Sequence, residues 1–261
     1  MTAQAPAAWV CVPTYNEREN IEGLVTGVRQ ALVDAGIDGH VLVVDDGSPD
    51  GTGRIADDMA ARDDRVHVLH RASKEGIGPA YRAGFRHAMA HGADLILEMD
   101  CDFSHDPHDV PRLIAAARGA DVVLGSRYVP GGGVAEWGIV RRAISRGGCL
   151  YAQAWIGTSV KDLTGGFKCF RREVLEAIPL EEVSGAGYVF QVEMTYRALL
   201  QGFRVVEVPI TFTDRTKGQS KMSRGIVMEA AVLVPRLRRR LGPLAARSAT
   251  SARGGHDRER V

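Results

Sequence analysis

The sequence predicts an α/β protein built on a mostly parallel sheet with helices on both faces. Apolar, strand-like runs alternate with helix-like segments of about 10 to 20 residues along the first half of the chain. Several of these runs are continuously apolar, as strands buried on both faces are. The chain has 261 residues, 45% of them hydrophobic, with a formal net charge of +1, which suits one large domain with an appendage.

The first half of the chain supplies most of the predicted sheet. WVCVPTY is expected to be a short strand that stops at Pro13, and Asn16 is a plausible N-cap for a helix that Gly36 ends. The predicted elements are a strand at 9–15, a helix at 16–36, a strand and glycine-rich turn within 40–53, a helix at about 52–63, a strand at 65–71, a helix at 79–92, a strand at 93–100, a helix at 106–119 and a strand at 120–128.

The second half is less regular. A flexible loop with three consecutive glycines is expected at 129–139. Beyond it we predict a helix at 140–157, a turn, strand and helix within 160–178, a helix at 187–203, a strand at 204–215, a polar loop at 216–223 and an apolar, then basic, helix at 225–242. The resulting organisation is a catalytic domain at 8–223, a basic amphipathic helix at 224–242 and a disordered tail at 243–261.

Several classes of protein are disfavoured by the composition. The N-terminus lacks the pattern of a secretory signal, and no run is long and apolar enough to span a membrane. The cysteines at 11, 101, 149 and 169 form no CxxC pair, so reduced thiols of a cytosolic protein are expected. We therefore expect a cytoplasmic protein that is soluble or peripheral at the cytoplasmic membrane face.

Polar side chains gather where the predicted strands end. In open parallel sheets, ligands bind beyond the carboxyl ends of the strands. Four strand ends carrying polar groups therefore indicate one shared site. These groups are Thr14 to Glu17, Asp45 and Asp46, Asp100 and Asp102, and Ser126 and Arg127.

The two acids in LILEMDCDFSHDP are the most informative pair. Asp100 and Asp102 could simply cap the next helix, although Ser104 or Asp106 could do that without them. On an extended chain, residues two apart lie on the same side, so the two carboxylates repel unless a positive group lies between them. Lysine, arginine or a hard cation would serve, and carboxylate oxygens suit Mg²⁺ or Mn²⁺ that shares its shell with substrate phosphates.

The stretch VVDDGSPDGT could be no more than a turn, since Gly, Ser, Pro and Asp are common turn formers. A turn needs no pair of acids, however, and Asp45 or Asp46 could accept hydrogen bonds from a ribose or a base edge. The chain has neither G-x-G-x-x-G nor a P-loop pattern here, which disfavours both the dinucleotide-binding fold and the P-loop fold.

Two groups of motifs resemble a known family. VPTYNE, VVDDGSPDGT, MDCDFSH and GSRY resemble the family-2 glycosyltransferases, which implies a GT-A-type, Rossmann-like nucleotide-sugar domain. RRAISRGG, DLTGGFKCFRREVL, GYVFQVEM and PITFTDRTKGQSKMS resemble the polyprenol-phosphate mannose synthases. Together the motifs span residues 10–223. The resemblance implies transfer of mannose from GDP-mannose to a polyprenyl phosphate, with inversion at C1 and with Mg²⁺ or Mn²⁺.

The resemblance also implies roles for individual residues. Asp100, Asp102, Arg127 and Arg215 would be the catalytic group, and Arg141, Arg142 and Ser145 would lie near the acceptor phosphate. The donor would contact Pro13, Tyr15, Glu17, Val43, Asp45, Asp46, Asp100, Cys101, Asp102, Arg127, Arg215 and Lys221. Asp100, Asp102 and Ser104 would face the metal, with Asp102 its direct ligand. Ser104 departs from the family pattern, because some relatives carry Gln there.

The implied acceptor makes a catalytic base unnecessary. A phosphate monoester has a second pKa of about 6, so a polyprenyl phosphate is already anionic near neutral pH. We therefore nominate no catalytic histidine, and His105 is expected to be structural or to support the site indirectly.

Three alternatives remain open: a polyprenyl-phosphate glucosyltransferase that uses UDP-glucose, a nucleotide-sugar binding protein without catalysis, and a nucleotidyltransferase. The last would carry a glycine-rich loop soon after the first strand, where this chain has no glycine until Gly23.

The segment GIVMEAAVLVPRLRRRLG permits two interpretations. It could be a terminal helix packed on the core with a solvated basic end, or an interfacial helix that holds the chain on anionic lipid. The long isoprenoid tail of the implied acceptor favours the second. A separate membrane protein that serves as the anchor is a further hypothesis. Nucleic acid is not an expected partner, since aromatic residues do not interleave with the basic ones.

Overall fold

The computed structural model describes residues 6–185, 187–214 and 224–244. Within the last range, it describes the side chains from residue 232 onward. The strands are β1 (Ala8–Thr14), β2 (Gly39–Asp45), β3 (Val66–His70), β4 (Leu95–Glu98), β5 (Val122–Ser126), β6 (Gly133–Val134), β7 (Lys168–Arg171), β8 (Val205–Pro209) and β9 (Thr211–Phe212). The α-helices are α1 (Ile21–Asp34), α2 (Thr52–Ala60), α3 (Ile77–Ala90), α4 (Val110–Ala116), α5 (Ile139–Ile156), α6 (Arg172–Ala177), α7 (Gly187–Leu200) and α8 (Arg224–Leu241).

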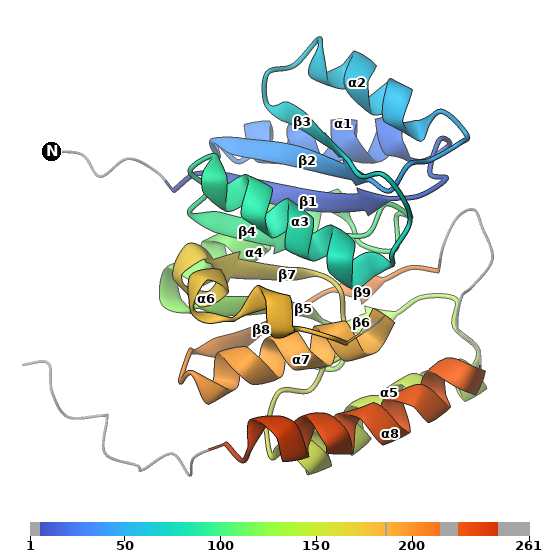
Figure 1. Cartoon of the computed structure of the whole chain (residues 1–261), viewed down its shortest axis with the longest axis vertical. Helices are drawn as coiled ribbons and strands as arrows, with labels where there is room; N and C mark the ends of the chain where they lie inside the picture. Colours follow the sequence, from blue (N-terminus) through green and yellow to red (C-terminus); the bar gives the residue numbers. More distant parts are fainter. Residues whose placement is uncertain (1–5, 186, 215–223, 245–261) are drawn as a thin grey trace, which may run out of the picture.

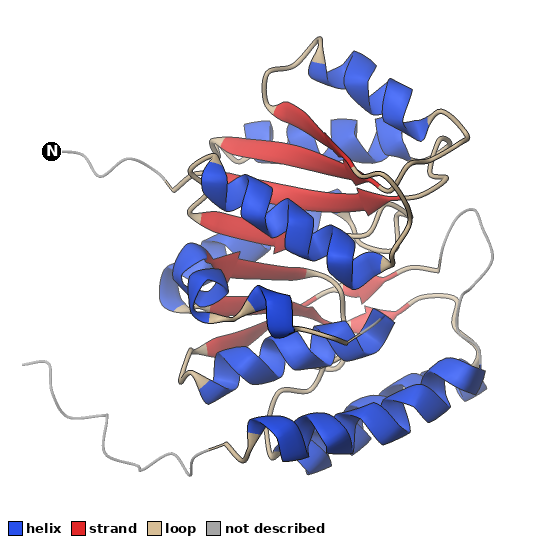
Figure 2. Cartoon of the chain, viewed as in Figure 1, coloured by secondary structure: helices blue, strands red, loops and turns tan. Residues whose placement is uncertain are grey.

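A seven-stranded sheet runs through the molecule in the order β3-β2-β1-β4-β7-β5-β8 (Figure 1). β7 is antiparallel to both neighbours, and the other described pairings in this sheet are parallel. β6 and β9 form a separate parallel pair. The expected α/β class with a mostly parallel sheet is confirmed, and helices cover both faces of the sheet (Figure 2).

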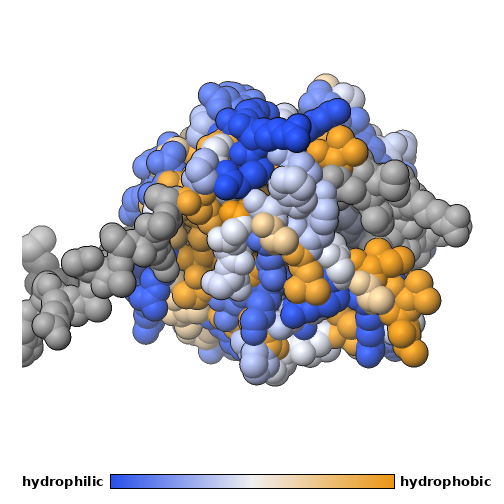
Figure 3. Space-filling view, turned by 90° about the horizontal axis from the view of Figure 1, so that it is seen from below, coloured by the Kyte–Doolittle hydropathy of each residue, from blue (hydrophilic) through white to orange (hydrophobic). Residues whose placement is uncertain are grey.

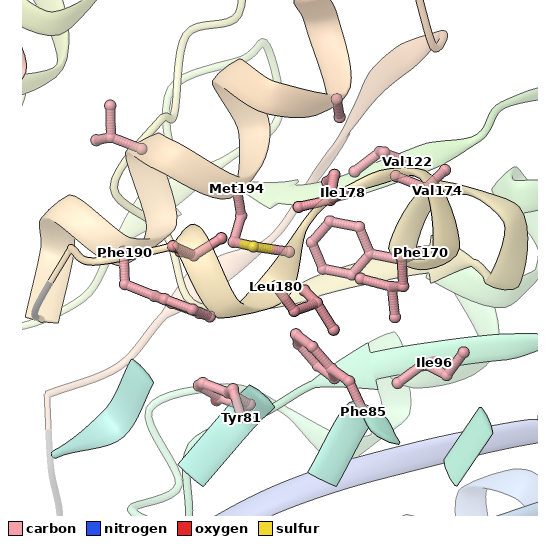
Figure 4. Close-up of a cluster of buried hydrophobic side chains, with 14 of the residues drawn as sticks. Tyr81, Phe85, Ile96, Val122, Phe170, Val174, Ile178, Leu180, Phe190 and Met194 are labelled. Atoms are coloured by element: carbon pink, nitrogen blue, oxygen red, sulfur yellow. The ribbon is translucent and has the colours of Figure 1, made fainter. Parts of the chain in front are cut away.

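Two hydrophobic clusters lie on opposite faces of this sheet. Side chains of successive strand residues point to opposite faces, so β1 sends Trp9 and Cys11 into one cluster and Val10 and Val12 into the other. The first cluster lies under α3, α6 and α7, where Phe85 from α3 meets aromatic and aliphatic side chains of β7 and α7 (Figure 4). The second lies under α1, α2 and α4. This two-sided burial explains why the strands are continuous apolar runs in the sequence.

The main differences from the predicted boundaries lie in two helices. The first helix begins at Ile21 rather than near Asn16, which has a φ of 60° in the preceding loop. The amide of Asn16 donates to Ser48 Oγ at 3.0 Å, so this loop is held by the turn after β2 and cannot start a helix. The helix predicted at 106–119 is α4 flanked by 3₁₀ turns at Pro107–Asp109 and Ala117–Gly119.

The strand predicted at 204–215 is two short strands. β8 pairs with β5, while β9 joins β6, which lies inside the loop expected at 129–139. The change of partner follows Pro209, which has no N–H to donate to a ladder. Arg215, the polar loop at 216–223 and the tail from 245 lie outside the described residues.

α8 confirms the predicted terminal helix and shows how it is packed. Val234 and Leu237 are buried in the first hydrophobic cluster, where α8 packs against α5 and α7. Arg238 donates to the carbonyl of Trp155, and Arg240 donates to Glu193 at 2.5 Å. The described part of α8 therefore joins the body of the protein. None of the described helices combines the length and apolar character that a bilayer span requires.

A group of histidines surrounds Trp9 at the sheet edge where β1 begins. The rings of His40 and His67 stack on the buried Trp9 ring at centroid distances of 4.6 and 4.5 Å. His40 Nδ1 lies 2.9 Å from His67 Nε2, and the group is completed by His87 of α3 and by His91, which directly follows this helix. Burial, together with neighbouring cationic groups, lowers the pKa of His40, His67 and His87.

These lowered pKa values predict a loss of stability in mild acid. Below the ordinary histidine pKa of about 6.5 the unfolded chain binds protons that the folded chain does not, so the free energy of unfolding should fall as pH decreases from about 7.5 to 5.5. His67→Phe should reduce the slope, measured by urea denaturation across this range. His108→Gln, at an exposed position away from Trp9, is the matched control. An unchanged slope in His67→Phe would contradict the interpretation.

Candidate active site

The carboxyl ends of β1, β2, β4 and β5 meet at one edge of the sheet. β2 and β4 flank β1 on opposite sides and are parallel to it. The chain therefore leaves β1 at a point where the strand order reverses, which is where open α/β sheets form their binding crevices. The polar groups that end the strands at Thr14, Asp45, Asp100 and Arg127 are brought to this edge, as the sequence predicted.

The turn after β2 is organised by the buried carboxylate of Asp45. Its Oδ1 accepts hydrogen bonds from Ser48 Oγ at 2.5 Å and from Thr14 Oγ1 at 3.2 Å, and its Oδ2 accepts one from the amide of Ser48. A Cβ at Gly53 would lie 2.9 Å from Asp45 Oδ2, so α2 can approach the acid only because residue 53 is glycine. Asp45 thus joins the ends of β1 and β2 to the start of α2.

Two basic residues of the loop after β3 lie at the same edge. Arg71 forms an ion pair with Asp46 at 2.5 Å. Burial raises the pKa of Asp46, and Arg71 partly offsets this by favouring its ionised form. Lys74 Nζ lies 4.0 Å from the centroid of the Tyr15 ring, a cation–π contact that places a positive charge beside a predicted nucleotide-binding residue.

The two acids after β4 have different surroundings. Asp100 Oδ1 accepts a hydrogen bond from the buried Tyr81 hydroxyl at 3.3 Å. Asp102 is 5% exposed, and its Oδ1 accepts a hydrogen bond from the amide of Ser104 at 3.0 Å. Directly after Asp102, Phe103 has a φ of 58°. The tight loop explains why the strand stops here, and it turns both acids away from regular strand pairing.

The chemistry of this loop fits a hard divalent cation. Among the described residues no cluster of three His, Cys, Asp or Glu side chains could hold a metal by itself. The loop instead offers two carboxylates and the Ser104 hydroxyl, which is buried and has no hydrogen-bond partner among the described atoms. All three are oxygen donors. An incomplete set of this kind matches the way Mg²⁺ takes one or two protein carboxylates and completes its shell with water and substrate phosphate.

His105 is held in an apolar setting behind the acids. Its ring stacks on Phe167 at 4.9 Å and meets Phe212 edge-on at 5.4 Å. Burial lowers its pKa to about 4, although the nearby Asp102 acts in the opposite direction. The imidazole is therefore neutral at neutral pH and is packed as a structural group.

A pair of buried charges lies at the end of β4, two residues before Asp100. Glu98 and Lys168 face each other across β4 and β7, and both are fully buried. Lys168 Nζ donates to the carbonyl and the side-chain oxygen of Gln191 at 2.7 and 2.6 Å. Burial raises the pKa of Glu98 to about 7 and lowers that of Lys168 to about 8, and each charge moderates the shift of the other.

Arg127, at the end of β5, is paired with Asp162 in a buried ion pair. Arg127 Nε and Nη2 donate to the two carboxylate oxygens of Asp162 at 2.7 and 2.6 Å, and the Arg127 amide donates to Oδ2 at 2.9 Å. Nη2 also donates to Thr164 Oγ1. Burial disfavours both charges, but each partner more than offsets this, so the pKa of Arg127 is raised and that of Asp162 is lowered.

Arginines and aromatic rings alternate from this ion pair to the start of α5. The Arg127 guanidinium lies 5.2 Å from the Tyr128 ring and 5.8 Å from the Trp137 ring. On these same rings lie two further guanidinium groups, Arg146 at 4.8 Å from Tyr128 and Arg141 at 4.3 Å from Trp137. Three positive charges therefore share two rings, which fixes their spacing.

The predicted acceptor residues lie around this series. The Tyr128 hydroxyl donates to Ser145 Oγ at 2.6 Å, which joins the end of β5 directly to α5. Arg141 pairs with Asp214 at 2.5 Å, and Arg142 donates to the carbonyl of Val134. Arg142 is exposed. Arg141 and Ser145 are thus brought together with Arg127, whereas Arg142 lies at the margin.

The remaining residues predicted for the donor site do not all lie at the strand edge. Pro13, Tyr15 and Glu17 lie at the strand edge and are half-buried, and Cys101 is buried between the two acids. Val43 is different, because its fully buried side chain lies in the hydrophobic cluster under α1 and α2. Arg215 and Lys221 lie outside the described residues.

The site also contains residues that the sequence did not single out, and four of them directly contact residues of its motifs. They are Tyr81, Lys74, Arg146 and Asp162, which respectively contact Asp100, Tyr15, Tyr128 and Arg127. Arg146 and Asp162 lie within the motifs RRAISRGG and DLTGGFKCFRREVL, so those motifs were the available signal. Nothing in the local sequence around Tyr81 distinguishes it from a core residue of α3.

Comparison with known proteins agrees with this geometry. The family model for glycosyl transferase family 2 matches residues 9–178, which carry all four strand ends of the site. An undecaprenyl-phosphate mannosyltransferase of Micrococcus luteus is 49% identical over 225 residues, covering 86% of this chain and 91% of its own. The chain belongs to glycosyl transferase family 2, among the polyprenol-phosphate mannose synthases.

Other relatives extend this family assignment. A polyprenol monophosphomannose synthase of Mycolicibacterium smegmatis is 50% identical over 223 residues, covering 85% of this chain and 83% of its own. Among solved structures, a glucosyl-3-phosphoglycerate synthase of Mycobacterium tuberculosis in complex with Mn²⁺, UDP-glucose and phosphoglyceric acid matches with a TM-score of 0.65 at 20% identity, over 91% of this chain and 80% of that one. Its likeness supports the fold, and the expected GT-A-type architecture is confirmed.

The buried ion pair between Arg127 and Asp162 predicts a specific loss of stability. Asp162→Ala should lower the free energy of unfolding by about 3–5 kcal/mol, because Arg127 would remain buried without its partner. The double variant Arg127→Met/Asp162→Leu should recover most of this loss. Urea denaturation measures both.

The matched control is Glu176→Ala, which breaks an exposed i,i+4 pair with Arg172 and should change stability by less than about 0.5 kcal/mol. If Asp162→Ala proved as mild as Glu176→Ala, the ion pair would not be the organising contact of this region.

Proposed function

We propose that this chain transfers mannose from GDP-mannose to a polyprenyl phosphate, with inversion at C1, to give a polyprenyl-phosphate mannose. The observation that carries the proposal is the arrangement of two anion-binding regions on one edge. Asp100, Asp102 and Ser104 suit a cation-bound diphosphate, and Arg141, Arg146 and Ser145 suit a second phosphate. The names of the two curated relatives support both the sugar and the acceptor class.

The donor would lie across the ends of β1, β2 and β4. Tyr15, with Lys74 on its ring, and the carboxylate of Asp45 or Asp46 would bind the nucleoside, as the family resemblance implies. A bound Mg²⁺ or Mn²⁺ would neutralise charge on the departing nucleoside diphosphate. Asp100 and Asp102 would hold that ion, and the Tyr81 hydroxyl would keep Asp100 in position.

The acceptor would enter from the α5 side. Arg141 and Arg146 would bind its phosphate, while Ser145, fixed by the Tyr128 hydroxyl, would donate a further hydrogen bond. A phosphate oxygen would form the bond to C1 as the bond from C1 to the diphosphate breaks, and the diphosphate leaves with the electron pair. Because the nucleophile is already anionic, the neutral and buried His105 need not accept a proton.

We also propose a positioning role for Arg127, whereas the family resemblance implies a catalytic one. Asp162 neutralises much of its charge, so it would act as a positioning residue for Tyr128 and Trp137 rather than as a free cation. Arg215 and Lys221 remain candidates for diphosphate contacts on the resemblance alone. Contact with the membrane that holds the acceptor, directly or through a separate anchor protein, is part of the same proposal.

The reaction itself is tested with labelled GDP-mannose and UDP-glucose, each with polyprenyl phosphate in detergent, in the presence of Mg²⁺ or EDTA. We expect a mannolipid that disappears with EDTA. Asp102→Ala should reduce transfer by at least about a thousandfold while the protein remains folded. Glucolipid from UDP-glucose alone would replace mannose with glucose in the proposal, and no lipid product from either donor would refute transferase activity.

The acceptor assignment makes a separate prediction. Arg146→Ala should raise KM for the polyprenyl phosphate by about 10- to 100-fold, the loss expected for one charge-assisted hydrogen bond. KM for GDP-mannose should be unchanged. Arg118→Ala, at an exposed position near the amino end of β5 and thus at the opposite edge of the sheet, is the control. Equal effects on both KM values would argue against an acceptor-specific role.

A further inference from the structure

A buried polar network lies close to Asp100, and the proposed mechanism gives it no role. It consists of Glu98 at the end of β4, Lys168 at the start of β7 and Gln191 on α7, which are 0%, 0% and 4% exposed. Buried charges and amides cost free energy unless they are paired, so three of them in one place need a reason. Their contacts indicate that the reason lies in the neighbouring site.

The ammonium group of Lys168 determines how the side chain of Gln191 is turned. Lys168 Nζ donates to the backbone carbonyl of Gln191 at 2.7 Å and to its side-chain Oε1 at 2.6 Å. Because an ammonium group can only donate hydrogen bonds, it must meet the oxygen of the amide and not the nitrogen. The NH2 group of Gln191 therefore points away from Lys168.

That NH2 group and the carboxylate of Asp100 border the same small space. A Cβ placed at Gly166, in the loop before β7, would lie 3.4 Å from Gln191 Nε2. The same Cβ would lie 3.8 Å and 3.9 Å from the two carboxylate oxygens of Asp100. Lys168 thus turns the two N–H donors of Gln191 toward the loop that carries the candidate cation ligands.

Glu98 shares this NH2 group and balances the charge of Lys168. Glu98 and Lys168 are paired residues of the antiparallel β4–β7 ladder. Burial raises the pKa of Glu98, and Lys168 and the Gln191 amide partly offset this by favouring the ionised form. The amide therefore acts on two carboxylates at the end of β4, those of Glu98 and Asp100, and an NH2 group has one N–H for each.

α7 also supports Asp100 through a second residue. The Tyr81 hydroxyl donates to Asp100 Oδ1 at 3.3 Å, and the Tyr81 ring stacks on Phe190 at a centroid distance of 6.0 Å. Phe190 directly precedes Gln191, and its side chain meets Tyr81 between α7 and α3 (Figure 4). Two successive residues of α7 thus act on Asp100, one through the tyrosine and one through its amide.

We propose that Gln191, oriented by Lys168, is a positioning residue for Asp100 and sets the affinity of the site for its divalent cation. This inference rests on the proposed function, which assigns the cation to Asp100 and Asp102. A carboxylate whose rotation is restricted by outer hydrogen bonds is already placed for the cation, and loss of such a partner typically weakens metal binding by about 10- to 100-fold.

Mn²⁺ binding in the presence of GDP tests the proposal without turnover, with free Mn²⁺ measured by electron paramagnetic resonance. Gln191→Leu keeps the size of the side chain but removes its amide, so it should raise the Kd for Mn²⁺ by about tenfold or more. The matched control is Gln201→Leu, which removes an exposed glutamine just beyond the end of α7 and should leave the Kd unchanged. A wild-type Kd in folded Gln191→Leu would overturn the proposal.

A charge-neutral double variant separates positioning from stability. Glu98→Met/Lys168→Met replaces the buried pair by apolar side chains of similar size, so it should unfold at close to the wild-type urea concentration. The net charge near the cation stays the same, but Gln191 loses the ammonium group that orients it. The Kd for Mn²⁺ should therefore still rise several-fold. Wild-type affinity in this variant would overturn the role of Lys168.

Gly166→Ala tests the space between the amide and the carboxylate. Its methyl group would meet both at ordinary contact distances, so the protein should fold, while Gln191 and Asp100 would be kept apart. The Kd for Mn²⁺ should rise in the wild-type background but little further in Gln191→Leu, because both changes remove one interaction. Additive effects of the two changes would show that Gln191 does not act across this space.

Turnover separates this inference from the proposed reaction. Raising the Mg²⁺ concentration should restore the transfer rate of Gln191→Leu toward that of the wild type, with KM for polyprenyl phosphate unchanged. A rate that stays low at every Mg²⁺ concentration would indicate a structural role and overturn the proposal. Absence of transfer by the wild type would refute the reaction and leave the Mn²⁺ result standing. Equal Mn²⁺ affinities in an active wild type and Gln191→Leu would refute only the positioning role.

Discussion

The buried ion pair between Arg127 and Asp162 is the contact on which the site depends. It joins the end of β5 to the segment before β7 through two side-chain contacts and a backbone hydrogen bond. A buried charge without its partner is strongly destabilising, so both residues must be placed together. Tyr128 and Trp137 lie against the same guanidinium, and through them the pair also sets the positions of Arg141 and Arg146.

A second constraint is the direction of the strands. Because β1, β2, β4 and β5 run parallel, their polar ends lie at one edge, while the histidine group around Trp9 lies at the other. β7 is inserted antiparallel between β4 and β5, which brings Lys168 opposite Glu98, two residues before Asp100. The edge therefore carries many charges, and several of the described ones are held by partners on neighbouring strands or loops. This arrangement favours a rigid site whose side chains are positioned before substrate binds.

α5 connects that site to the outside of the molecule. Its first turns contribute Arg141, Ser145 and Arg146 to the candidate acceptor region, while its outer side carries large apolar side chains that are exposed. Seen from the side of α5 and α8, the molecule presents apolar side chains together with strongly polar ones (Figure 3). One helix can do both because its 3.6-residue period places the two sets of residues on different sides. α8 supports it from the side with Val234 and Leu237, so the pair lies below α7 as a separate layer (Figure 1).

The sequence by itself determined the α/β class, most elements, and the strand-end acids, because apolar periodicity and local turn chemistry act over a few residues. It also placed Asp45, Asp100 and Asp102 at one edge of the sheet, since the carboxyl ends of parallel strands lie together there. Only the tertiary structure decided that Asp162 neutralises Arg127, that Tyr81 bonds Asp100, and that β7 runs antiparallel. These contacts join residues far apart in the chain, so no local pattern specifies them. The exposed face of α5 was also decided by the tertiary structure. A helical pattern in the sequence shows an apolar stripe, but it does not show which side of the helix the core covers.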